Sequence, residues 1–103
     1  MSISAGFEVA AADGPAPYEL DCTAFCAKES TGDSIASVTV SVASGTGVLG
    51  TGLRAPVVQA LTTVIYWMDF TASQPGDVTV VQFAVTTASG HGPFHKTIAF
   101  TAT

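Results

Sequence analysis

The clearest pattern in the sequence is the octapeptide IASVTVSV, residues 35–42. From Val38 to Val42 every second residue is valine, and small hydroxyl residues stand between the valines. Strict alternation of apolar and polar residues has the period of a β-strand with one buried face, and valine and threonine favour strands. The octapeptide therefore predicts a half-buried strand.

Segments of the same kind lie on both sides of this octapeptide. Residues 18–25, 78–87 and 94–101 also alternate, and residues 57–70 are rich in β-branched and aromatic side chains that divide into two strands around Thr62. Strands that recur roughly every 10 to 15 residues are typical of all-β domains. Val57, Leu61, Val64 and Met68 also fit a helical spacing, but the β-branched and aromatic content of their segment favours strand. We therefore predict an antiparallel β-sandwich, with Trp67 as the large residue of its core.

The connections between these strands carry turn residues. Pro75-Gly76 suits the two central positions of a type II turn. Residues 44–53 contain four glycines and predict a short strand or an irregular loop, and they lack the lysine and following helix of a phosphate-binding loop.

The first 17 residues differ from the rest of the chain. They are rich in alanine, glycine and serine, and they end in two prolines, which impose an extended backbone. We expect an N-terminal arm over residues 1–17 and a sandwich over residues 18–103. Because apolar residues alternate along this arm, we expect it to pair with a neighbouring molecule. The predicted partner-interface residues are Ile3, Phe7, Val9, Pro15, Pro17 and Tyr18.

The composition excludes several classes of partner. Charged residues make up 11% of the 103 residues, against roughly 25% in ordinary soluble domains, and the net charge is −5. Three scattered bases, Lys28, Arg54 and Lys96, form no positive stripe, so we expect no nucleic acid and no anionic membrane as partner. No apolar run reaches the roughly 20 residues of a membrane span. A surface with so few charges indicates a protein that works inside an assembly.

Residues 1–8 lack the basic start and apolar stretch of a secretory signal, so we expect the protein to remain in the cytoplasm in which it is made. In that reducing compartment, Cys22 and Cys26 are expected to be small buried side chains. On a strand they would lie about 13 Å apart, too far for a disulfide.

The residues that could carry chemistry are few. His91 and His95 stand four apart on a predicted turn and strand, where that spacing does not create a metal site. Four of the acidic residues fall in predicted turns, where they cap the backbone. No serine lies in a nucleophile elbow. We expect no enzyme: no catalytic residue, no metal and no cofactor. The turn acids are Asp13, Glu29, Asp33 and Asp77.

Two longer stretches carry a resemblance. The sequence QPGDVTVVQFAVTTASG, residues 74–90, precedes a closing strand, and DSIAS, residues 33–37, precedes the alternating octapeptide. These stretches resemble small Ig-like proteins of tailed bacteriophages, over residues 33–100. The resemblance implies an Ig-like β-sandwich and a structural part of the virion: a head decoration or cement protein, or a neck or tail accessory protein. It implies no catalytic residue.

Composition and resemblance together predict a capsid decoration protein that binds the major capsid protein or other virion proteins. We expect a homo-oligomer, with a trimer favoured, on the capsid surface. The alternative is a carbohydrate- or receptor-binding module associated with the tail, neck or fibre. That alternative predicts Tyr18, Tyr66 or Trp67 exposed together with acids on one face.

Overall fold

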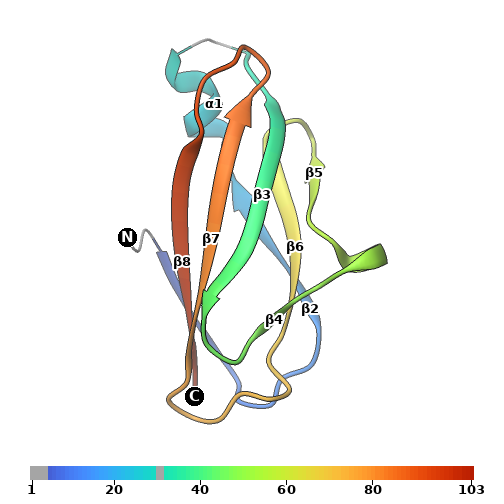
Figure 1. The fold of residues 1–103 in the computed structure, drawn as a ribbon, viewed down its shortest axis with the longest axis vertical. Helices are drawn as coiled ribbons and strands as arrows, with labels where there is room; N and C mark the ends of the chain where they lie inside the picture. Colours follow the sequence, from blue (N-terminus) through green and yellow to red (C-terminus); the bar gives the residue numbers. More distant parts are fainter. Residues whose placement is uncertain (1–4, 30–31) are drawn as a thin grey trace.

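The computed structural model describes residues 5–29 and 32–103 and shows two β-sheets packed face to face (Figure 1). The all-β sandwich predicted from the sequence is confirmed. The first sheet has the order β1-β8-β7-β3, and its strands are β1 (Ala5–Val9), β8 (Phe94–Ala102), β7 (Val78–Thr87) and β3 (Ile35–Ser44). The second sheet has the order β2-β6-β4, and β5 also pairs with β6. Its strands are β2 (Ala16–Asp21), β6 (Thr63–Asp69), β4 (Val48–Leu49) and β5 (Val57–Gln59).

Strand β3 contains the octapeptide, and it pairs with β7 in antiparallel register. The described strands pair antiparallel throughout, except that β1 runs parallel to β8. The predicted division of residues 57–70 into two strands is confirmed by β5 and β6. The predicted turn is confirmed too: Asp77 N–H donates to the Gln74 carbonyl at 3.0 Å, and Gly76 has a φ of +95° that suits glycine.

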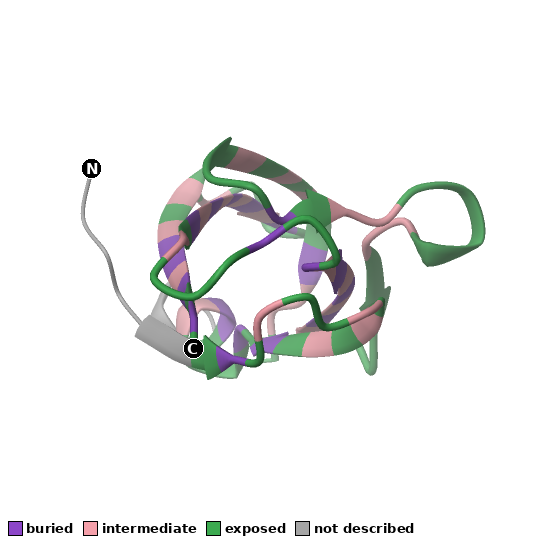
Figure 2. Cartoon of the chain, turned by 90° about the horizontal axis from the view of Figure 1, so that it is seen from below, coloured by how far each residue is buried: buried purple, intermediate pink, exposed green. Residues whose placement is uncertain are grey.

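Alternation along the strands sends one side chain in two into a single apolar core. Burial along β7 alternates from Thr79 to Thr87, and β6 alternates in the same way. In the view from below, the strands form a ring, and buried residues alternate with less buried ones along them (Figure 2). The largest fully buried side chains are Tyr66, Phe70, Phe83, Phe100 and Met68.

Tyr66, and not Trp67, fills the core at the second sheet, so the prediction for Trp67 is wrong. The two residues are adjacent on β6 and therefore face opposite ways. Tyr66 is fully buried and packs edge-on to Phe83, with ring centroids 5.0 Å apart. Its hydroxyl is buried without a hydrogen-bond partner among the described residues. Trp67 lies half-buried on the outer face.

The strand expected over residues 18–25 ends at Asp21, and the helix α1 (Thr23–Glu29) follows. A strand is predicted for the whole of residues 18–25, so this prediction is wrong for its second half. The Asp21 carboxylate accepts hydrogen bonds from the N–H and the hydroxyl of Thr23, at 2.9 and 2.6 Å, and such a side chain starts a helix. Cys22 and Cys26 therefore lie one helical turn apart, where both remain free and buried as expected. Burial raises the pKa of Cys22 to about 11, which keeps its thiol protonated at neutral pH.

The described part of the expected arm, residues 5–17, belongs to the sandwich. Strand β1 pairs with β8 of the same chain, which places the backbone of Phe7 opposite that of Phe100. Val9 is 8% exposed and lies in the core. The apolar alternation that predicted pairing with a neighbour is therefore used within the chain. Ile3 lies outside the described residues.

Candidate binding surface

The predicted interface residues that the structure describes do not gather into one surface. Pro15 and Pro17 are exposed, as an interface requires. Tyr18 instead turns inward, and its ring meets that of Phe100 edge-on at 5.0 Å between centroids. Val9 also lies in the core, so of the four predicted residues whose side chains the structure describes, Pro15 and Pro17 are exposed.

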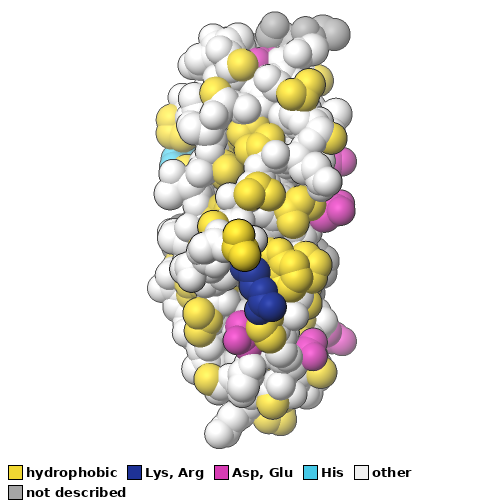
Figure 3. Space-filling model, turned by 90° about the vertical axis from the view of Figure 1, so that its right-hand side faces the viewer, with side chains coloured by type: hydrophobic (Ala, Val, Ile, Leu, Met, Phe, Trp, Pro, Cys, Tyr) yellow, Lys and Arg dark blue, Asp and Glu magenta, His cyan; other side chains and the backbone are white. Residues whose placement is uncertain are grey.

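A different surface is formed by the far edge of the second sheet. Five large apolar side chains are exposed between β4 and the start of β6, and we call them the apolar edge: Val48, Leu53, Val57, Val58 and Leu61. Leu53 is 105% exposed relative to an isolated residue. Figure 3 faces this side and shows hydrophobic side chains along the length of the molecule, with basic atoms among them. Apolar groups gathered on one side mark an interaction surface more often than scattered ones do.

Leu53 sits in the short 3-10 helix η1 (Gly52–Arg54), on a loop that projects sideways from the sandwich (Figure 1). Hydrogen bonds close the loop on itself, from Arg54 N–H to the Thr51 carbonyl at 3.0 Å and from Ala55 N–H to the Gly52 carbonyl at 3.2 Å. These bonds fix the backbone that carries Leu53. A partner that binds Leu53 therefore does not have to order this loop, which lowers the conformational-entropy cost of binding.

Arg54 ties this loop to the second sheet. Its guanidinium carbon lies 5.0 Å from the ring centroid of Trp67, a cation–π contact, and Gly50 N–H donates to the Trp67 carbonyl at 2.8 Å. A hollow of about 290 Å³ lies beside this contact, and Asp69 and Thr51 also line it. Trp67 therefore supports the projecting loop from outside the core.

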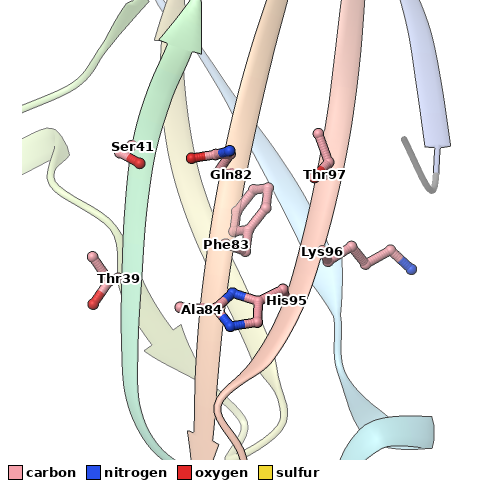
Figure 4. A pocket seen from close by; sticks show the side chains of 8 residues that line it. All are labelled: Thr39, Ser41, Gln82, Phe83, Ala84, His95, Lys96 and Thr97. Carbon is pink, nitrogen blue, oxygen red and sulfur yellow. The ribbon is translucent and has the colours of Figure 1, made fainter. Parts of the chain in front are cut away.

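The outer face of the first sheet is polar and uncharged over much of its area. A shallow hollow of about 500 Å³ crosses three strands. Figure 4 shows Thr39 and Ser41 on β3 beside Gln82 on β7, with His95 and Thr97 on β8. Thr39, Ser41 and His95 are exposed here, whereas Thr97 is buried, and Lys96 also lines the hollow. The exposed hydroxyls keep this part of the face hydrated without charge.

The structure also brings together a serine, a histidine and an aspartate that the sequence did not connect. The Ser89 hydroxyl donates a short hydrogen bond to the Asp33 carboxylate, and it lies 3.1 Å from Nδ1 of His91. Asp33 accepts a further bond from Ser89 N–H at 3.1 Å. Because the serine proton is held by the carboxylate, the hydroxyl is not activated by histidine as in a catalytic triad. The cluster joins the loop before β3 to the loop after β7.

The Asp33 cluster makes the stability of the fold depend on pH. The hydrogen bond from the Ser89 hydroxyl holds the pKa of Asp33 well below its usual value, and bonds from Thr87 and from backbone N–H groups add to this. A carboxyl with a lowered folded-state pKa stabilises the fold above its unfolded pKa of about 4, and this stabilisation is lost as the pH falls toward the folded value.

We expect Asp33→Asn to lower the melting temperature most at neutral pH. The gap between the variant and the wild type is expected to narrow below about pH 4, because the unfolded wild-type chain then binds a proton at Asp33 that the folded chain binds only at lower pH. Thermal melts in a pH series measure this directly. Asp77→Asn serves as a control from another turn, and a gap for Asp33→Asn that stays constant down to about pH 2 would contradict the expectation.

In residues 5–29 and 32–103, no group of three or more histidine, cysteine or acidic side chains could hold a metal ion. The helices of this same part of the chain are all too short or too polar to cross a membrane. Comparisons of the chain with family models, curated proteins and solved structures find no match.

Proposed function

We propose that this chain is a non-enzymatic structural protein of a virion, an Ig-like sandwich that decorates the capsid and binds the major capsid protein. The observation that carries the proposal is the apolar edge with its projecting Leu53. The resemblance of residues 33–100 to small Ig-like phage proteins supplies the virion as the setting, and the low charge content fits a chain covered by partners.

The apolar edge supports docking because its exposure has no evident use within the folded chain. Leu53 extends into solvent, and Val57 and Leu61 are more than half exposed. Burying one leucine side chain contributes about 1.5–3 kcal/mol, so a partner with a matching pocket gains most from Leu53. Arg54 beside it is held over Trp67, which leaves a defined cation at the rim of the contact.

The mechanism that follows is adhesion. Each copy would contribute a modest contact to the shell, and many copies that bridge neighbouring subunits would add these contacts together. A small sandwich with both sheets closed over one core is suited to this, since it transmits force without rearrangement.

The alternative, a carbohydrate- or receptor-binding module, has less support. It predicts exposed aromatic side chains on one face, but Tyr66 is fully buried and Tyr18 faces the core. Trp67 is partly accessible beside Asp69, yet Arg54 lies over its ring. A sugar would have to displace this cation before it could stack on the indole.

The test is binding of the purified chain to capsid shells assembled without it. We expect Leu53→Ser to weaken binding by roughly 10- to 100-fold, the loss expected when one buried leucine contact is removed. Val78→Ser is the matched control, because Val78 is also exposed, at 45%, but lies at the start of β7 in the other sheet. Co-sedimentation with the shells gives the bound fraction.

Equal binding by Leu53→Ser and wild type would remove the apolar edge from the proposal. Failure of the wild-type chain to bind the shells, together with its absence from purified virions by mass spectrometry, would overturn the decoration role itself.

A further inference from the structure

The outer edge of β3 is a long sheet edge without the usual protection against pairing. Strand β3 ends the first sheet and spans ten residues, and it contains neither charge nor proline. At its start the Ile35 N–H donates to the Leu61 carbonyl at 2.8 Å, so the edge available for pairing begins after Ile35. No residue from Ser34 to Leu53 is charged. An exposed edge offers unpaired backbone N–H and carbonyl groups to another strand, and natural proteins usually block such edges with charges, proline or short length.

The other edges of the described sheets carry this protection. On the second sheet, β2 contains Pro17, Glu19 and Asp21, and the opposite edge consists of β5 and β4, of three and two residues. On the first sheet, β1 has five residues and includes Glu8. Strand β3 therefore stands apart as an edge open to pairing.

The middle of β3 is also regular. The register with β7 shifts between Ile35 and Ser37 and again between Val42 and Ser44, and it is continuous from Ser37 to Val42. Across these six residues the serines and threonine are exposed, while the valines are half-buried at the margin of the core. A strand added here would cover the valines from the side.

We propose that β3 pairs antiparallel with β3 of a second copy about a two-fold axis, joining two first sheets into one continuous sheet. This goes beyond the proposed function and does not depend on it. The sequence of the strand favours a second copy as the partner, because it reads the same in both directions around Thr39: Ser-Val-Thr-Val-Ser.

With the axis at Thr39, Ser37 lies opposite Ser41 of the second copy, and Val38 lies opposite its Val40. Hydroxyls then meet hydroxyls on the outer face, and valines meet valines on the inner face, which are favourable cross-strand pairs. The net charge of −5 does not oppose this contact locally, because the strand and its neighbours in sequence are uncharged. The two-fold contact is self-complementary and closes as a dimer, in place of the trimer expected from the sequence.

Light scattering behind size exclusion, over a wide range of concentration, tests the proposal. The wild-type chain is expected to run at twice its monomer mass of 10.4 kDa. The double variant Ser37→Lys/Ser41→Lys places like charges opposite one another and is expected to weaken the dimer by roughly tenfold or more. Both positions are exposed, so circular dichroism should show an unchanged fold.

A second variant separates edge pairing from general damage. Ser37→Glu/Ser41→Glu alone is expected to be monomeric as well, but an equal mixture of the lysine and glutamate variants is expected to restore the dimer, because opposite charges then face each other. Thr101→Lys is the control, since Thr101 is exposed on β8, an inner strand of the same sheet. A monomeric or trimeric wild type, a dimer retained by the lysine variant, or a mixture that fails to dimerise would each overturn the proposal.

Discussion

Replacing Phe100 with alanine is expected to lower the free energy of unfolding by about 3–5 kcal/mol, the range for large aromatic deletions in a core. Phe100 is fully buried on β8, where both sheets contribute to its surroundings. Its ring lies 5.0 Å from that of Tyr18, 5.3 Å from that of Phe70 and 6.4 Å from that of Tyr66, between centroids. These three rings come from the opposite sheet and its following loop, so the substitution opens a cavity at the contact between sheets.

Urea unfolding, followed by the fluorescence of the single tryptophan, measures the loss. Small domains have a total stability of about 5–15 kcal/mol, so Phe100→Ala should leave the protein marginal. Phe94→Ala is the matched control from the same strand. Phe94 is half-buried and stacks on Phe25 at 5.7 Å, so its removal should cost clearly less. Equal losses for the two variants would mean that the sheets are not held together by this aromatic cluster.

The strands that the sequence predicts well are those whose burial follows simple alternation. Residues 37–42 and 78–87 alternate in sequence and also in burial, because each strand places one face on the core and one toward solvent. Before Ser37 a register shift interrupts the alternation of burial in β3. Local pattern was insufficient near Asp21, where the first half of an alternating segment is a strand and the second half is a helix. There the Thr23 N–H and hydroxyl donate to the Asp21 carboxylate just before the helix, a contact that periodicity does not reveal.

The choice between Tyr66 and Trp67 shows a second limit. Within the apolar run of residues 64–68, adjacent side chains must point to opposite faces of the strand. The sequence does not show which of the two faces packs on the core, because both are apolar. The register with β2 and β5 decides it. Residues 5–9 show a third limit, since their pattern predicts pairing but not whether the partner strand is β8 of the same chain.

The candidate surface was harder to predict than the fold. Leu53 follows Gly52 in a glycine-rich stretch, and a large apolar residue at that place was the available signal. Whether Leu53 is exposed for binding depends on the projection of η1. It also depends on the contact of Arg54 with Trp67, two residues that are 13 apart in sequence. The Asp33 cluster depends in the same way on a contact between Asp33 and Ser89, 56 residues apart.

Gly45→Ala is expected to destabilise the fold by about 3 kcal/mol or more, for two reasons that add. Gly45 follows β3 with a φ of +103°, which costs other residues about 1–2 kcal/mol. A Cβ at this position would also lie 2.5 Å from the Thr79 Cα and 2.5 Å from the Val78 carbonyl oxygen. Both atoms belong to the backbone of β7 and cannot turn aside, so the end of β3 must shift away from β7, and such overpacking costs about 1–3 kcal/mol.

Gly76→Ala separates these two contributions. Gly76 has a comparable φ of +95°, but nothing lies within 4 Å of the position that its Cβ would take. We therefore expect Gly76→Ala to lower the melting temperature by the backbone contribution alone, and Gly45→Ala to lower it at least twice as far. Calorimetry of both variants gives the comparison. Equal shifts would show that the end of β3 can move away from β7, and the edge proposed to pair with a second copy would then lack the rigid support that β7 gives it.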